Sequence, residues 1–178
     1  MPRNIEIKTR IDSVEAMLSR ARALAEDPPQ VIEQDDTFFP CAHGRLKLRD
    51  FGDGCGELIH YERADAQGPT RSDYICAPTS DPATLRDALS RALGVAGRMR
   101  KTRLLLLTGQ TRIHLDRVHG LGDFMELEVV LHDGQTDADG AGVAEGLMRA
   151  LGLADAPRLA GAYMDLLVAS AKPPDPAA

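Results

Sequence analysis

The stretch Arg3–Asp12, RNIEIKTRID, alternates polar or charged residues with isoleucines over most of its length. Asn4, Glu6 and Lys8 fall at every second position, and an isoleucine stands between each of them and the next. A period of two is typical of a β-strand that has one apolar face and one charged face. The fold depends on where the charged face lies, because it can either meet water or line the inside of a closed sheet.

The composition describes an acidic chain with enough apolar residues for a core. The 178 residues fit one domain, and 43% hydrophobic and 27% charged residues are normal for a folded protein. A net charge of −6 and an isoelectric point of about 5.3 argue against a general nucleic-acid binder, which must neutralise phosphates. They do not exclude a local basic site.

The chain shows no targeting signal. No apolar run approaches the length of a membrane-spanning helix, and the charged N-terminal strand does not resemble a signal peptide. Cys41, Cys55 and Cys76 are odd in number and share no CxxC spacing, which favours free thiols in a reducing compartment. We therefore expect a cytoplasmic protein whose partner is neither a membrane nor a nucleic acid.

Hydrophobic periodicity and turn residues predict eight strands, at residues 3–11, 30–40, 45–51, 57–65, 70–77, 98–108, 110–118 and 123–131. They predict helices at residues 12–26, 80–94, 137–153 and 157–171. Asp12 with Glu15 is a candidate capping box for the first helix. Ser80 or Asp81 is a candidate cap for the second, which Gly94 ends.

The number and order of these elements indicate an α+β domain with an antiparallel sheet or barrel. Residues 1–170 are expected to form this single domain. The Pro-rich residues 171–178 are expected to be a loose tail.

Several predicted strands carry ionisable residues on one face and aliphatic residues on the other. In RLKLR, residues 45–49, two leucines separate three basic residues, and in MELEV, residues 125–129, apolar residues separate two glutamates. The same-face sets are Arg45, Lys47 and Arg49; Lys101 and Arg103; Arg112, His114 and Asp116; and Glu126 and Glu128.

For any single strand, the simpler interpretation is an open sheet whose apolar face is covered by helices and whose charged face meets water. For the whole set this interpretation is weaker, because ionisable residues are unusually frequent and the signs are separated into few carboxylates and many cations. Eight strands can also close into a barrel with room for side chains or one small ligand. If the charged face turned inward, helices would have to cover the outside.

A charged lumen would be costly unless a charged ligand fills it. An excess of Arg and Lys suits a polyanion, because Arg binds phosphate through a bidentate fork. Carboxylates among those cations suit a hard divalent ion, Mg²⁺ or Mn²⁺, that bridges protein and phosphate oxygens. The pattern therefore indicates a metal–polyphosphate site, although each Glu could instead pair with a cross-strand Arg or Lys.

Several short motifs occur in a characteristic order. They are NIEIK (4–8), LKLR (46–49), YER (61–63), RKTR (100–103), HLDRVHGLGDFMELE (114–128) and GAYMDLL (161–167), which contains Tyr163. In this order they resemble the motifs of the CYTH domain, or triphosphate tunnel metalloenzyme, family, whose hallmark is an N-terminal ExExK strand. The family includes class IV adenylyl cyclases and thiamine and inorganic triphosphatases, and the resemblance runs from about residue 3 to 168.

The resemblance implies a closed eight-stranded antiparallel β-barrel that forms a tunnel with a charged lumen, with helices packed on its outside. It implies one or two divalent metals, Mg²⁺ or Mn²⁺. By position the metal ligands would be Glu6, Glu126 and Glu128, with Asp116 in addition. The residues that would bind the triphosphate are Lys8, Lys47, Arg49, Arg63, Lys101, Arg103 and Arg112.

The family's two reactions differ in their nucleophile and in the phosphorus attacked. In hydrolysis a water attacks the terminal phosphorus, and in cyclisation the ribose 3′-hydroxyl of ATP attacks the α-phosphorus. Both depend on positioning, charge neutralisation and metal help more than on covalent catalysis. A deprotonated lysine could act as base, so Lys8, Lys47 and Lys101 are the candidate catalytic residues.

Asn4 departs from the family pattern, which has a glutamate at this position. An Asn carbonyl oxygen can still bind Mg²⁺ or orient a metal-bound water, but it cannot supply the missing negative charge. We therefore expect weaker metal binding than in an all-Glu site, or one metal where relatives hold two.

The leading hypothesis is a metal-dependent enzyme that hydrolyses tripolyphosphate, a nucleoside triphosphate such as ATP, or thiamine triphosphate. Cyclase action on ATP ranks second, because no adenine-recognition feature is visible and the HF element that precedes ExExK in typical class IV cyclases is not found. A binding module that holds a polyphosphate without turnover, and an open sheet without ligand, are the other hypotheses. The sequence predicts no oligomeric state.

Overall fold

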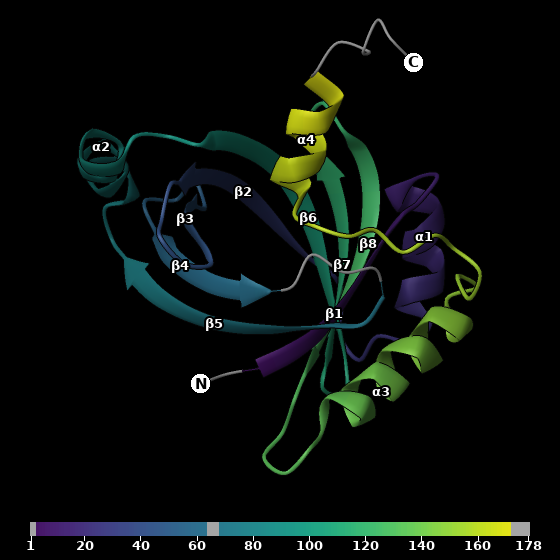
Figure 1. The fold of residues 1–178 in the computed structure, drawn as a ribbon. Coiled ribbons are helices and arrows are strands. Elements are labelled where there is room, and N and C mark those ends of the chain that lie inside the picture. Colours follow the sequence, from purple (N-terminus) through teal and green to yellow (C-terminus); the bar gives the residue numbers. More distant parts are fainter. Residues whose placement is uncertain (1–2, 64–67, 172–178) are drawn as a thin grey trace, which may run out of the picture.

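The computed structural model describes residues 3–63 and 68–171. Of the expected tail at 171–178, Ala171 is the last residue of a helix, and residues 172–178 lie outside the described residues. Within the described ranges the chain forms eight strands and four helices (Figure 1). The elements are β1 (Arg3–Arg10), α1 (Val14–Arg22), β2 (Gln30–Phe39), β3 (Arg45–Asp50), β4 (Gly56–Arg63), β5 (Thr70–Thr79), α2 (Pro82–Leu93), β6 (Gly97–Thr108), β7 (Thr111–Val118), β8 (Gly122–Val130), α3 (Asp137–Ala150) and α4 (Tyr163–Ala171).

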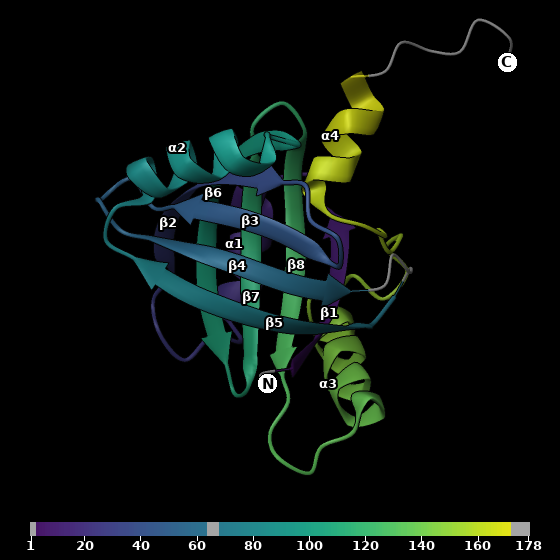
Figure 2. The same ribbon diagram turned by 60° about the vertical axis from the view of Figure 1, so that its left-hand side comes forward.

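The strands close into one barrel in the order β1-β5-β4-β3-β2-β6-β7-β8, and every neighbouring pair is antiparallel. Figure 2 shows β3, β4 and β5 crossing in front of β6, β7 and β8. The predicted α+β fold with a closed eight-stranded antiparallel barrel is therefore confirmed. The open-sheet alternative is wrong.

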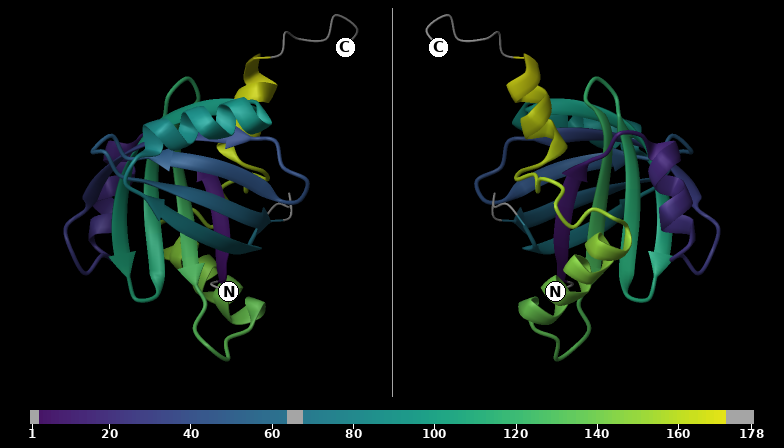
Figure 3. Two further views of the ribbon diagram at one scale, coloured as in Figure 1. Left: turned by 90° about the vertical axis from the view of Figure 1, so that its left-hand side faces the viewer. Right: turned by 90° about the vertical axis from the view of Figure 1, so that its right-hand side faces the viewer.

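The barrel turns its aliphatic face outward and covers it with helices. On β1, Ile5 and Ile7 are almost fully buried outside the barrel, in one core cluster with Ala144 and Met148 of α3. Contacts join α3 to β1 and β8, α1 to β7 and β8, α2 to β2 and β3, and α4 to β6. Figure 3 shows α1 and α3 along one side of the barrel and α2 across its top. Outward alternation therefore builds the hydrophobic core, and inward alternation is left to line the lumen.

The first helix begins and ends inside its predicted bounds. Ser13, not Asp12, is the N-cap, because Ser13 has the extended backbone and its Oγ accepts a hydrogen bond from the Ala16 N–H at 3.1 Å. The helix ends before Glu26, whose N–H bonds to the Leu107 carbonyl and whose carboxylate accepts from the Gly109 N–H. Contacts with the β6–β7 turn therefore replace the last predicted helical turn.

The last helix begins at Tyr163, six residues after the predicted start at Pro157. Residues 157–162 instead form an extended strap: Leu159 N–H donates to the Lys8 carbonyl at 2.9 Å, and Thr9 Oγ1 donates to the Pro157 carbonyl at 2.8 Å. Gly161, with φ +76°, adopts a left-handed conformation that suits glycine. Bonding to β1 therefore draws this segment across the barrel end before α4 can start.

Two further sequence expectations concern membrane-spanning helices and the state of the cysteines. Within residues 3–63 and 68–171, no helix is both long enough and apolar enough to cross a lipid bilayer. The three cysteines are exposed free thiols.

Two glycines of α3 have very different surroundings. A Cβ added at Gly140 would lie 2.6 Å from Leu131 Cδ2 and 2.7 Å from Ile5 Cγ1, because α3 approaches the barrel closely there. A Cβ added at Gly142, on the exposed face, would meet no described atom within 4 Å. Gly140 therefore permits the close packing of α3 on β1, whereas Gly142 takes no part in that packing.

We expect Gly140→Ala to lower the free energy of unfolding by about 1–3 kcal/mol, since the methyl group must displace packed core side chains. The matched control Gly142→Ala should raise it by about 0.5–1 kcal/mol, because alanine favours the helix and restricts the unfolded chain. Urea unfolding measures both changes. Changes of the same sign would contradict the close approach of α3 to β1.

Candidate functional site

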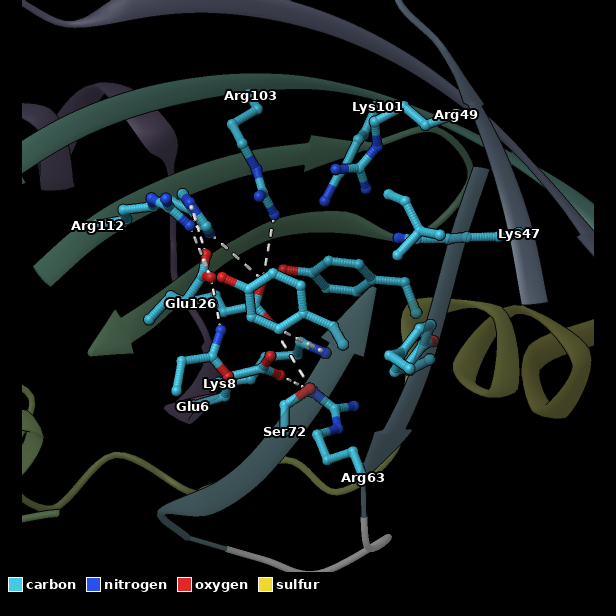
Figure 4. A pocket seen from close by; sticks show the side chains of 18 of the residues that line it. Glu6, Lys8, Lys47, Arg49, Arg63, Ser72, Lys101, Arg103, Arg112 and Glu126 are labelled. Atoms are coloured by element: carbon cyan, nitrogen blue, oxygen red, sulfur yellow. Dashed lines mark hydrogen bonds and ion pairs between the residues drawn. The ribbon is translucent and has the colours of Figure 1, made fainter. Parts of the chain in front are cut away.

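The barrel encloses a cavity of about 220 Å³ that is lined by side chains from all eight strands and from the start of α4. Seven Lys and Arg side chains and four Glu side chains face it. Figure 4 shows Lys47, Arg49, Lys101 and Arg103 on one side of the cavity and Glu6 and Arg63 across from them. The charged alternation of the sequence therefore points into the lumen.

The first basic pair, Lys47 and Arg49 of β3, is hydrogen-bonded to a buried carboxylate of β2. Asp36 is 0% exposed, and its two oxygens accept from Arg49 Nε and Nη2, both at 2.8 Å. Lys47 Nζ also donates to Asp36, at 2.8 Å. Burial disfavours the charged carboxylate, but Arg49 and Lys47 outweigh that effect and hold the Asp36 pKa well below its usual range.

The second basic pair comes from β6 and rests on Asp116 of β7 in the same way. Arg103 Nε and Nη2 bind the two Asp116 oxygens at 2.6 Å each, and Lys101 Nζ donates at 2.8 Å. Asp116 is 0% exposed and lies behind the wall, outside the lining of the cavity. Burial opposes its charged form, but Arg103 and Lys101 hold its pKa well below its usual range.

Burial lowers the pKa of Lys101 to about 7, and Arg103 adds to this effect while Asp116 opposes it. The pKa of Lys47 is also lowered, first by burial and then by Arg49, while Asp36 opposes the change. Burial therefore makes the ammonium form of both lysines less favourable than in water.

The glutamates occupy the other side of the lumen. Glu6 of β1 accepts a hydrogen bond from Arg63 of β4, and Glu126 of β8 lies 3.4 Å from Lys8 Nζ and accepts from Arg103 Nη2 at 3.1 Å. Burial and the nearby Glu126 raise the pKa of Glu6, although Arg63 opposes the rise. The pKa of Glu126 is lowered despite burial, chiefly by Lys8.

Asn4 and Glu128 lie side by side at the same wall. Asn4 is 2% exposed and donates from Nδ2 to Glu128 Oε1 at 2.5 Å, and Arg112 Nη1 donates to the same oxygen at 2.9 Å. Among the described residues, Asn4 Oδ1 is buried and accepts no hydrogen bond. A buried oxygen without a donor is costly unless a ligand or a water meets it.

The strap before α4 forms one end of the cavity. The Gly161 carbonyl accepts from Lys8 Nζ at 3.1 Å and from Arg63 Nη2 at 2.6 Å. The Tyr163 ring lies 4.2 Å from Lys8 Nζ and 4.9 Å from Lys101 Nζ, measured to the ring centroid. The C-terminal segment therefore contacts cations from three strands, β1, β4 and β6, through a carbonyl and an aromatic face.

The donor set has the chemistry that a hard divalent cation requires. Glu6, Glu126 and Glu128 offer carboxylate oxygens, and Asn4 Oδ1 offers an unengaged carbonyl oxygen beside Glu128. In the described parts of the chain, no three His, Cys, Asp or Glu groups are already clustered closely enough to hold a metal. Arg63, Lys8 and Arg112 occupy the carboxylates instead.

The structure brings ten of the eleven sequence-predicted site residues to the cavity wall and places Asp116 behind it. Sequence reasoning missed Asp36 and the Gly161 carbonyl. A signal for Asp36 existed: it precedes Arg49 by 13 residues across a predicted hairpin, and Asp116 follows Arg103 by the same interval. A backbone carbonyl leaves no such signal.

A family model described as CYTH domain matches residues 2–163. No curated protein sequence matches the chain. Among solved structures, PH1012 from Pyrococcus horikoshii OT3 has a TM-score of 0.82 at 22% identity, with 92% of this chain and 99% of that chain covered.

Two further solved structures share this fold. A candidate adenylate cyclase from Vibrio parahaemolyticus has a TM-score of 0.74 at 18% identity, with 93% of this chain and 97% of that chain covered. HpAC1 from Hippeastrum, described as an adenylyl cyclase candidate with a dominant triphosphatase activity, has a TM-score of 0.70 at 15% identity, with 98% of each chain covered. At these identities the likeness shows the fold.

We expect the Lys101 side chain to titrate near pH 7, because burial disfavours its ammonium form. Lysine ¹³Cε shifts followed against pH measure this, and the loss of the signal in Lys101→Arg assigns it. Above pH 7 the folded chain sheds this proton while the unfolded chain keeps it to about pH 10.5, so the unfolded state binds more protons.

The wild type should therefore gain stability relative to Lys101→Arg as the pH rises above 7, by at most about 1.4 kcal/mol per pH unit. Urea unfolding of both proteins between pH 6 and pH 9 measures the difference. A difference that does not change with pH, or a Lys101 signal that titrates near pH 10, would contradict the lowered pKa.

Proposed function

The chain belongs to the CYTH domain family, and on that premise we propose that it is a divalent-metal-dependent enzyme acting on a triphosphate bound in its barrel. The proposed reaction is hydrolysis of tripolyphosphate, a nucleoside triphosphate or thiamine triphosphate. The observation that carries the proposal is the barrel cavity that seven basic side chains line. The triphosphatase activity named for the Hippeastrum protein of this fold supports hydrolysis as the reaction.

The seven cations fall into two groups according to the carboxylates that hold them. Lys47, Arg49, Lys101 and Arg103 are backed by aspartates that lie behind the wall. Lys8, Arg63 and Arg112 pair with glutamates that face the lumen. An entering triphosphate would leave the aspartate pairs of the first group intact. It would compete with the glutamates for the second group and for Arg103, which also donates to Glu126 at 3.1 Å.

That competition links substrate binding to metal binding. When phosphate oxygens take Arg63, Lys8 and Arg112, the lumen glutamates lose these three cationic partners, although Arg103 still lies beside Glu126, and they become more available to a divalent cation. Mg²⁺ or Mn²⁺ would then be held by Glu6, Glu126 and Glu128, with Asn4 Oδ1 beside them. The metal would supply charge neutralisation at the phosphate oxygens.

The chain's own residues supply grip and proton transfer. Arg49 and Arg103 present planar guanidinium groups that their aspartates hold in place, so they can bind phosphate oxygens without losing much side-chain freedom. Lys101 titrates near neutral pH, which suits a group that accepts the proton of the attacking water. Asp116, which binds Lys101 and Arg103, is assigned to positioning in place of metal ligation.

Cyclisation of ATP is the second candidate. Phe38, Ile59 and Met99 give the cavity wall an apolar portion on which a nucleobase could lie. A third candidate is a module that binds a polyphosphate without turning it over. The products distinguish the three.

We expect phosphate release from tripolyphosphate, ATP or thiamine triphosphate in the presence of Mg²⁺ or Mn²⁺, and a fall of roughly 10²–10³-fold in kcat for Glu126→Gln. Phosphate and pyrophosphate assays together with detection of cyclic AMP measure the products. Glu15→Gln, on the exposed surface of α1, is the control and should keep full activity. Formation of cyclic AMP and pyrophosphate would contradict hydrolysis and support cyclisation. Binding without any product would contradict both reactions and support a binding module.

We expect Asn4→Glu to strengthen metal binding, because it adds a carboxylate beside Glu128 where the wild type has an uncharged amide. The half-saturating Mn²⁺ concentration should fall by about tenfold, and Mn²⁺ alone should raise the melting temperature more than in the wild type. Without metal the variant should be less stable, since two carboxylates then lie together. Asn4→Gln is the control that changes size without charge, and an unchanged metal requirement in Asn4→Glu would contradict this role of Asn4.

A further inference from the structure

We propose that Asp36 is a positioning residue for triphosphate binding, which holds Lys47 and Arg49 in the orientation that receives the phosphates. The inference rests on the proposed function, because it takes the lumen to be the triphosphate site. Asp36 itself does not line the cavity and therefore acts through the two basic residues.

The first ground is the way in which Asp36 uses its oxygens. Both oxygens bind the Arg49 guanidinium in a two-point arrangement, and one of them also accepts from Lys47. A two-point contact fixes the plane of a guanidinium as well as its place. Arg49 is 12% exposed and Lys47 is 14% exposed at the side chain, so both still reach the lumen.

The second ground is the repetition of the arrangement. Asp116 binds Arg103 through two oxygens and Lys101 through one, as Asp36 binds Arg49 and Lys47. Around the barrel the strands β3, β2, β6 and β7 therefore present cations, carboxylate, cations and carboxylate in turn. One wall of the lumen is thus built twice from the same unit, with a buried aspartate at the centre of each copy.

The third ground is the charge that Asp36 compensates. Arg49 lies close enough to Lys47 to oppose its charge, and burial also disfavours the ammonium of Lys47. Without Asp36, Lys47 would shed its proton more readily and Arg49 would be free to leave the wall. The wall would then lose both charge and shape at the point where phosphate binds.

The neighbouring Asp35 provides a matched control on the same strand. Asp35 points outside the barrel, where Arg98 binds its oxygens at 2.7 Å and 2.6 Å and Arg100 contacts it at 3.1 Å. Asp35→Asn and Asp36→Asn therefore remove the same charge, and each removes it from a two-point arginine pair. They differ in the face on which the pair lies.

We expect Asp36→Asn to raise the KM for tripolyphosphate by about tenfold to a hundredfold while kcat changes by less than about threefold, since binding and transition state lose the same contacts. Asp35→Asn should leave both within about twofold of the wild type. Calorimetry with tripolyphosphate and Mg²⁺ gives the affinities independently of turnover. If the wild type neither binds nor hydrolyses a triphosphate, the proposed function fails, whereas equal behaviour of the two Asn variants in an active protein overturns the role of Asp36.

Non-additivity separates positioning from a general effect on the fold. In a Lys47→Met, Arg49→Met background, Asp36→Asn should cost no further affinity, because the groups that it positions are gone. A further loss of the same size as in the wild type would overturn the proposal.

If Asp36→Asn does not fold, the triple variant Asp36→Asn, Lys47→Met, Arg49→Met remains informative, because it has no buried cation to compensate. Recovery of folding in the triple variant would show that Asp36 serves the two basic residues. Continued failure to fold would show that Asp36 serves the barrel itself, and would overturn the proposal.

Discussion

Seven basic side chains line the inside of a closed barrel, and the structure depends on the ion pairs that make this possible. Each of the seven contacts a carboxylate: Asp36, Asp116, Glu6, Glu126 or Glu128. Burying a cation without such a partner would cost several kcal/mol, roughly the whole stability of a small domain. The carboxylates are therefore part of the fold before they are part of any reaction.

The need to face charge inward also dictates what lies outside. A barrel whose lumen is polar cannot use that lumen as its hydrophobic core, so the aliphatic residues of each strand must be buried by helices. Ile5, Ile7, Leu127 and Val129 are accordingly buried against helices on the outer surface. Gly140 allows α3 to approach β1 at this surface. Helix packing and lumen chemistry are thus two consequences of one alternation.

The sequence predicted the parts of this structure that depend on local pattern. Alternation in RNIEIKTRID and RLKLR identified which side chains share a face, and turn residues placed the strands to within a few positions. Register lies beyond such patterns, because the pairing of Asp36 with Arg49 joins residues on different strands whose offset is set by the whole hairpin. Asp36 was missed because it stands between Asp35 and Thr37 in a segment without clean alternation, and its 13-residue interval to Arg49 identifies a partner only when the register of the hairpin is known.

Long-range backbone contacts set a second limit on what the sequence could predict. The strap at 157–162 has the composition of a helix start, but it is hydrogen-bonded to β1, and its Gly161 carbonyl accepts hydrogen bonds from Lys8 and Arg63. Asn4 shows how the two requirements of fold and site meet in one residue. Its Nδ2 amide donates to Glu128, as a cation would, and this contact stabilises the wall without a metal. Among the described residues, its carbonyl oxygen accepts no hydrogen bond, so it is one atom that could bind a metal. A glutamate at position 4 would be a stronger metal ligand. It would also destabilise the metal-free barrel, because Glu128 would then face a second negative charge in place of a hydrogen-bond donor. The asparagine therefore favours the metal-free barrel, and under the proposed function it does so at the expense of metal affinity.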